Sequence, residues 1–249
     1  MKKFLLAAAL AETLLTGFHP PQLEVKEGSG TVVKKSEKKA IADLQHLVQT
    51  AEVEEAWAYA PVPQRWHDIG TKTNLTEGES VTVDNDMNII KMVAKQYDRL
   101  VFYHIHPEKG ILKVIKPMLE NPKENGLTAQ EIVHLCQLSA VLPSSNDLAN
   151  ALYLSCRYDR HHLHHYRVAS LYGITDYRPQ SQKISDFCSE KDDFTLLFSV
   201  QFVAEVIVKD LNLVQLEETV KTAFDRKKSV AVLPNDYFTI TFTPYSAFK

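Results

Sequence analysis

The feature that most constrains the fold is an apolar, aromatic run, Leu100 to Ile105, which overlaps the motif His104-Ile105-His106-Pro107. A short run of this composition is typical of a buried strand, and a proline ends it because proline cannot donate to a sheet ladder. Residues two apart point to the same face of a strand, so the two imidazoles project together. Two polar rings on an apolar strand are costly to bury without a partner. The pattern predicts either a pair of metal ligands or two partly exposed histidines at a strand end.

A second motif follows in the segment Pro143-Ser144-Ser145-Asn146-Asp147, which is predicted to open a helix. The spacing S-x-x-D is that of a capping box, with Ser144 as the N-cap and Asp147 three residues later. In the simpler interpretation Asp147 only interacts favourably with the helix dipole. In the functional interpretation its carboxylate also binds a metal held by the histidines, while a serine hydroxyl polarises a carbonyl oxygen.

Taken together, the strand-borne H-x-H-P and the later P-S-x-x-D resemble the JAMM motif of MPN-domain metalloproteases. In that family two histidines and an aspartate bind zinc, and a water molecule takes the fourth place. An upstream glutamate acts as general acid and base, and the motif serine helps to stabilise the tetrahedral intermediate. The resemblance implies His104, His106 and Asp147 as zinc ligands and Ser144 as the stabilising residue.

The resemblance places the catalytic glutamate near the start of a strand that follows the first helix. That context is Glu54-Glu55, directly after the predicted helix at 41–48, and we favour Glu55 with Glu54 as the alternative. Glu77 and Glu79 are further candidates in a turn-like Glu-Gly-Glu. The simpler interpretation of any of them is a solvated glutamate.

The chain departs from the family pattern in two places. Ile105 stands where the family has serine or threonine, and it points away from the face of the two histidines. The two parts of the motif are also far apart, since 147 − 106 gives a separation of 41 residues where the family has a few. Residues 108–141 are therefore expected to be a helical insertion that rises beside the cleft as a lid or recognition element.

Helical and strand patterns alternate along the chain without a glycine-rich phosphate loop, which predicts an α/β (α+β) fold. We expect an MPN-like domain at 38–180, with a central mixed sheet flanked by helices. A polar stretch at 180–193 marks a boundary before a C-terminal αβ extension at 194–249. Similarity to MPN domains also includes the strand and turn at 167–174.

Composition limits the partners and the compartment. The net charge of −3 does not favour nucleic acid or an acidic membrane as the main partner, and no stretch after the N-terminus reaches the length of a membrane span. Residues 1–37 are expected to be a signal segment and linker, because Lys2-Lys3 and the apolar run at 4–10 are typical of export; an amphipathic helix is the alternative.

The chain has three cysteines, Cys136, Cys156 and Cys188, which are too few for a disulfide framework. They are expected to be small core residues.

The leading hypothesis is a zinc-dependent peptidase or isopeptidase that acts on a peptide or protein, ubiquitin-like conjugates included. Export would make the protein periplasmic or secreted, and a peptide, a cell-wall fragment or a host protein would then be favoured over ubiquitin as the substrate. Otherwise the protein is expected to be cytoplasmic. The first alternative is an MPN-like domain without catalysis that serves as a binding scaffold. The second is another metallohydrolase fold that shares only the H-x-H pattern.

Overall fold

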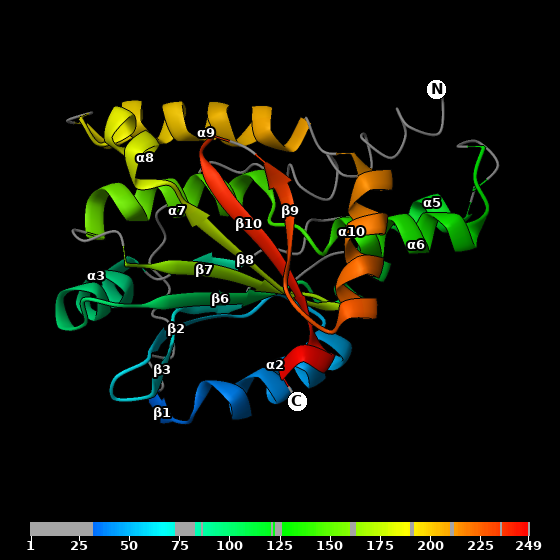
Figure 1. Ribbon diagram of the computed structural model, residues 1–249, viewed down its shortest axis with the longest axis horizontal. Helices are drawn as coiled ribbons and strands as arrows, with labels where there is room; N and C mark the ends of the chain where they lie inside the picture. The colour runs from blue at the N-terminus through cyan, green and yellow to red at the C-terminus, as the bar shows by residue number, and fades with distance from the viewer. Residues whose placement is uncertain are drawn as a thin grey trace.

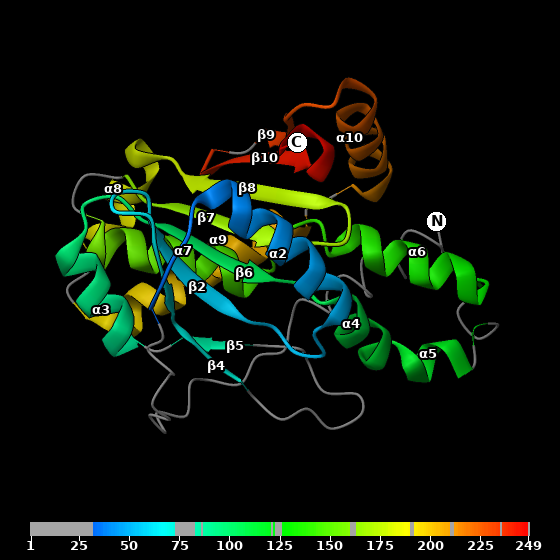
Figure 2. The same cartoon turned by 90° about the horizontal axis from the view of Figure 1, so that it is seen from below.

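The architecture is a mixed sheet between two helical layers (Figures 1 and 2). A computed structural model describes residues 32–72, 83–85, 87–120, 122, 126–159, 163–189, 192–209, 212–234 and 236–248. The eight-stranded sheet has the order β1-β3-β2-β6-β7-β8-β10-β9. Its strands are β1 (Val32–Lys34), β2 (Ala56–Ala60), β3 (Arg65–Asp68), β6 (Val101–Ile105), β7 (His165–Ala169), β8 (Gly173–Pro179), β9 (Val230–Pro234) and β10 (Phe238–Pro244).

The helices cover both faces of this sheet, and a two-stranded ribbon lies apart from it. The ribbon consists of β4 (Gly70–Lys72) and β5 (Val83–Asn85). The helices are α2 (Glu37–Thr50), α3 (Met87–Gln96), α4 (Glu108–Val114), α5 (Lys116–Glu120), α6 (Ala129–Ser139), α7 (Ser145–Tyr158), α8 (Ser181–Cys188), α9 (Asp193–Lys209) and α10 (Leu213–Arg226), with a final 3₁₀ turn, η2 (Tyr245–Phe248). The predicted α/β (α+β) class, with a mixed sheet flanked by helices, is confirmed.

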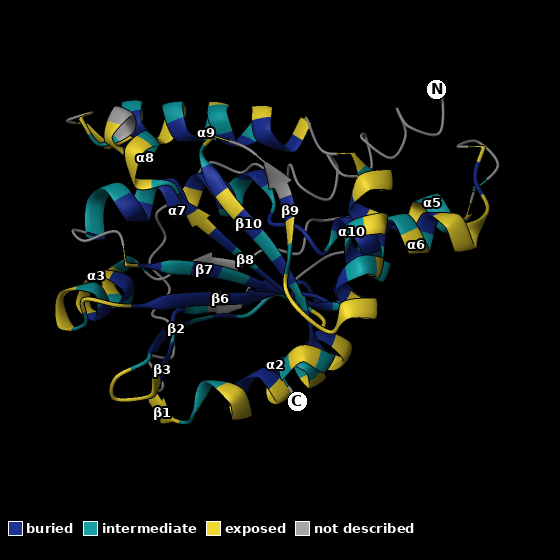
Figure 3. Ribbon diagram, viewed as in Figure 1, coloured by how far each residue is buried: buried dark blue, intermediate teal, exposed yellow. Residues whose placement is uncertain are grey.

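The central strand β6 is buried along its whole length (Figure 3). It pairs antiparallel with β2 and parallel with β7. A parallel pair needs a crossover connection, and the chain between these strands supplies one through α4, α5, α6 and α7. The crossover brings the N-terminus of α7 back to the end of β6, where the two halves of the predicted motif meet.

Side chains alternate between the two faces of β6 and define two cores. Tyr103 and Ile105 face α2, which contributes Ile41 and Leu44 to that core. Phe102 faces the other side, in the core that α7 shares with α9 and α10. His104 lies two residues from Phe102 and therefore shares the face covered by α7.

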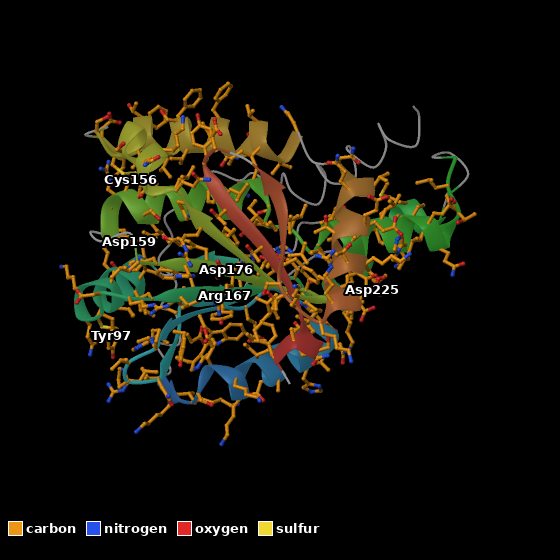
Figure 4. All side chains as sticks on the ribbon, viewed as in Figure 1. Tyr97, Cys156, Asp159, Arg167, Asp176 and Asp225 are labelled. Carbon is orange, nitrogen blue, oxygen red and sulfur yellow. A yellow bond between two sulfur atoms is a disulfide. The ribbon has the colours of Figure 1, made fainter. Side chains whose placement is uncertain are left out.

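A half-buried ion pair links the sheet to α2. The guanidinium of Arg167 on β7 donates to Asp176 on β8 at 2.7 Å and to Glu37 of α2 at 2.8 Å. Tyr103 also donates to Glu37, at 2.7 Å. Figure 4 shows Arg167 and Asp176 side by side in the sheet. The nearby guanidinium of Arg167 and the imidazole of His165 outweigh burial and lower the pKa of Asp176, so the pair is charged.

The C-terminal segment contributes strands to the central sheet. β10 pairs with β8 along its whole length, from Phe238 opposite Pro179 to Pro244 opposite Gly173. α9 packs on α7 and forms an outer layer, and α10 packs beside β9 and β10. Most of the polar stretch at 180–193 forms α8.

The cysteines differ from the prediction. Cys156 at the end of α7 and Cys188 at the end of α8 form a disulfide, while Cys136 is free and buried. Figure 4 labels Cys156 on α7, close to α8. Only Cys136 therefore behaves as the small core residue that the sequence led us to expect. It belongs to a separate cluster with Ile111 and Ile132 in the segment 108–141, which is helical as predicted.

The N-terminal prediction lies largely outside the described residues, which begin at Val32. Residues 32–34 form β1, which pairs antiparallel with β3 at the edge of the sheet. No helix in the described part of the chain is long and apolar enough to cross a membrane.

Candidate metal centre

The sheet and α7 bring the two histidines and the aspartate together, although Asp147 lies 41 residues beyond His106 in the sequence (147 − 106). His104 is the penultimate residue of β6 and His106 follows the strand directly. Asp147 lies in the first turn of α7, whose N-cap is Ser144. Both histidines are buried, each with 8% of its surface exposed. Three polar side chains thus converge at the carboxyl end of the central strand.

The distances between their ligand atoms fit a metal ion. Nε2 of His104 lies 3.2 Å from Nε2 of His106 and 3.2 Å from Oδ2 of Asp147. Nε2 of His106 lies 3.6 Å from the same carboxylate oxygen. Bonds of about 2.0–2.1 Å in a tetrahedral arrangement place neighbouring ligand atoms roughly 3.3 Å apart. The three side chains therefore form a group that could hold a metal ion.

Contacts behind the ligands fix their orientation. Nδ1 of His106 lies 2.9 Å from the carbonyl oxygen of Ala140, just after α6. A carbonyl can only accept, so Nδ1 carries a proton and donates it, which leaves Nε2 of the neutral ring as the ligand nitrogen. A hydrogen bond of this kind is typical of histidines that bind metals. Residue 140 thus ties the 108–141 segment directly to the site.

The capping box orients Asp147. Its backbone N–H donates to Oγ of Ser144 at 3.1 Å, and the N–H of Ser144 donates to Oδ2 of Asp147 at 2.7 Å. The same oxygen faces both histidines. The capping interpretation and the ligand interpretation of this motif are therefore compatible, because one carboxylate serves both.

The charges in the site are strongly coupled. Burial lowers the pKa of His106, but the hydrogen bond and charge of Asp147, the charge of Glu54 and the carbonyl of Ala140 outweigh it and raise the pKa to about 9. Burial raises the pKa of Asp147, and the imidazoles of His104 and His106 outweigh it and hold the pKa well below its usual range. Ligands must be deprotonated to bind a metal, so binding at this site releases protons.

The glutamate whose carboxylate lies beside the site is Glu54, which the sequence offered as the alternative to Glu55. Oε1 of Glu54 lies 3.7 Å from Nε2 of His106. The sheet register pairs Ala56 with His104, so alternation puts residue 54 on the face of the histidines. The backbone carbonyl of Glu55 accepts from the N–H of Ile105 at 3.1 Å, so alternation assigns residue 55 to the face opposite the histidines. Composition located the strand start, but the register decides which of two adjacent glutamates faces the site.

Two contributors to the site were not anticipated. Ala140 acts through its backbone carbonyl, which no side-chain pattern reveals. Tyr177 on β8 places its ring edge-on to His104, with ring centroids 6.5 Å apart, and it packs beneath the site. Its position on the same face follows only from the pairing of β7 with β8. Glu77 and Glu79, the other glutamate candidates, lie outside the described residues.

Comparison of the chain with protein-family models, with curated proteins and with solved structures finds no match.

Proposed function

We propose that this protein is a zinc-dependent hydrolase that cleaves an amide bond, with His104, His106 and Asp147 as zinc ligands. The observation that carries the proposal is the set of distances between the three ligand atoms, 3.2, 3.2 and 3.6 Å. The resemblance of the motif residues to JAMM metalloproteases points to the same ligands.

The distances also bear on the choice of metal. Two histidines and a carboxylate can bind non-haem iron(II) as well as zinc. Right-angled ligands at similar bond lengths lie about 3.0 Å apart, whereas tetrahedral ones lie about 3.3 Å apart. All three separations exceed 3.0 Å, with values of 3.2, 3.2 and 3.6 Å, so the arrangement favours tetrahedral zinc.

The ligand set favours a catalytic over a structural role. Structural zinc sites are closed by four protein ligands and are usually rich in cysteine, whereas catalytic sites use three and leave a position for water or substrate. Among the described cysteines, Cys156 and Cys188 are bonded to each other, and Cys136 belongs to the separate core of the 108–141 segment. When bound, zinc supplies Lewis acidity and lowers the pKa of its water towards about 7.

The chain supplies groups for proton transfer and charge stabilisation. The side chain of Glu54 is 15% exposed and its carboxylate lies beside the ligand nitrogen of His106, which suits a general base that passes its proton to the leaving amine. The Oγ of Ser144 accepts from the N–H of Asp147, which leaves its hydroxyl proton to donate to a substrate oxygen. These roles are the proposed ones for the two residues.

A peptide or protein is the proposed substrate, and the 108–141 segment is the proposed recognition element. The segment starts directly after Pro107 and returns to the site at Ala140. The Cys156–Cys188 disulfide supports export, since disulfides persist in oxidising compartments and are rare in reducing ones. Export favours a peptide over a ubiquitin-like conjugate.

The test is a hydrolysis screen on peptide libraries with two neighbouring variants, Glu54→Gln and Glu55→Gln. We expect Glu54→Gln to lower kcat by about 10²–10⁴-fold while zinc stays bound, because only the proton acceptor is lost. Glu55→Gln is the matched control and should stay close to the wild-type rate. Loss of activity in Glu55→Gln alone would contradict the assignment of the base. A wild type that binds zinc and hydrolyses nothing would favour the binding scaffold.

A further inference from the structure

α9 is apolar on both sides, although the described part of the chain covers only one of them. Its buried positions, Leu196, Val200, Ala204, Ile207 and Val208, form the face that packs inward in the core shared with α7. A helix that lies at the surface of a globular protein normally carries polar residues on its outer side. α9 forms the outermost layer on that side of the sheet (Figure 1).

The outer face of α9 carries a ridge of large apolar side chains. Phe194, Phe198 and Phe202 are 80%, 70% and 63% exposed, and Leu197 and Val206 are also exposed. In α9, all of which the structure describes, every exposed position between Asp193 and Lys209 is apolar. Residues 194, 198, 202 and 206 follow at steps of four, which is the spacing of a ridge that packs into the groove of another helix. We call these five residues the α9 ridge. Side chains stand out from the outer side of this helix in Figure 4.

The area of the ridge is large enough to drive association. A phenylalanine buries on the order of 200 Å² when it is covered, so the exposed parts of the three rings amount to roughly 400 Å². Single-chain proteins rarely leave larger apolar patches in water. Two copies of the ridge would together remove about 800 Å² before Leu197, Val206 and the helix flanks are added, which approaches the roughly 1,000 Å² where specific interfaces begin.

We propose that the α9 ridge is a homodimer interface, in which α9 pairs antiparallel with α9 of a second copy about a two-fold axis. The two-fold axis lies near residue 200, midway between Phe194 and Val206. Phe194 then meets the second copy's Val206, and Phe198 meets its Phe202. A two-fold interface uses the same patch on both copies, and this ridge satisfies that condition because its large side chains are spread evenly about the midpoint.

The charges at the ends of the helix favour this occupant. Asp192 and Asp193 lie at the N-terminal end of α9 and Lys209 lies at its C-terminal end, all three exposed. Antiparallel pairing places Asp192 and Asp193 of one helix beside Lys209 of the other. Asp193 also accepts from Arg157 at 2.8 Å within its own chain, and Asp192 accepts from the N–H of Thr195. An anionic membrane surface would be repelled by the same two carboxylates, so the charge pattern favours a second copy over a lipid surface.

The oligomeric state of the full chain tests the proposal. We expect the wild type to sediment at twice the mass of one chain in analytical ultracentrifugation, and to dissociate on dilution. The double variant Phe198→Glu/Phe202→Glu should raise the dissociation constant by at least about 1,000-fold, because it places four charges in an apolar interface and removes four rings from it. In a single chain Phe198 and Phe202 are 70% and 63% exposed, so their replacement should leave the fold of the monomer unaffected.

Met92→Glu is the matched control. Met92 on α3 is 53% exposed and lies outside the α9 ridge, so this variant should stay dimeric. Circular dichroism checks the fold of each variant, and Phe198→Gln/Phe202→Gln replaces the charged pair if that pair unfolds. A wild type that stays monomeric at every concentration overturns the proposal. Binding of such a monomer to vesicles of anionic lipid would point to a membrane surface as the occupant of the ridge instead. A dimer that survives in the ridge variants, or that Met92→Glu dissociates equally, overturns it too.

Discussion

Removal of the Cys156–Cys188 disulfide should cost this fold a large part of its stability. The bridge joins residues 32 positions apart and ties the end of α7 to the end of α8. In the chain-entropy model, closing a loop of that length removes about 12 cal/mol/K from the unfolded chain, or about 3.7 kcal/mol at 25 °C. Domains of this kind are stable by only about 5–15 kcal/mol, so the loss should be plain in any unfolding curve.

The assay is urea unfolding of the wild type with and without reductant, beside the double variant Cys156→Ala/Cys188→Ala. We expect the reduced wild type and the double variant to unfold at similar, lower urea concentrations, and reductant to have no further effect on the variant. Cys136→Ala is the control, because it removes a buried thiol and leaves the bridge and the response to reductant in place. A double variant as stable as the oxidised wild type would refute the argument from loop closure.

Two further predictions concern single side chains. Ser144→Ala should lower stability by about 1 kcal/mol and Ser144→Gly by only a few tenths, because glycine tolerates the N-cap conformation. If the hydroxyl also stabilises the transition state, both variants lower kcat alike, and an unchanged kcat in both would leave Ser144 as a cap alone. His67 is buried, and within the described part of the chain neither of its ring nitrogens is hydrogen-bonded. Burial, followed by the charge of Arg65, lowers its pKa below the ordinary 6.5. The unfolded chain therefore binds more protons than the fold just below about pH 6.5, so stability falls as the pH drops through that window. His67→Phe should reduce this loss in thermal unfolding between about pH 5 and 7, and an unchanged pH dependence would contradict the assignment.

Local patterns in the sequence were sufficient for the parts of the site that depend on one element at a time. Alternation along β6 placed both imidazoles on one face, and S-x-x-D placed Asp147 in the first turn of α7. Neither pattern shows that the two elements meet. His106 and Asp147 are separated by 41 positions in the sequence, and a local pattern carries no information about contacts over that separation. The motif resemblance supplied that link, and the structure brings the three candidate ligands together.

Other features depend on pairing in space. Glu54 and Glu55 are equivalent in composition, and only the register of Ala56 against His104 separates them. The disulfide requires α8 to pack beside α7, and the segment that contains α8 has the polar composition of a boundary. The strand β10 was expected from its alternation, but its long pairing with β8, which places it in the central sheet, has no local signature.

Metal content tests the central claim most directly. Elemental analysis of the purified protein should find about one zinc per chain, and the double variant His104→Ala/His106→Ala should lose it. The control His46→Ala/His134→Ala removes two exposed histidines away from the site and should retain the zinc. Iron in place of zinc would contradict the tetrahedral assignment. A wild type that holds no metal even after zinc is supplied would contradict the metal centre itself.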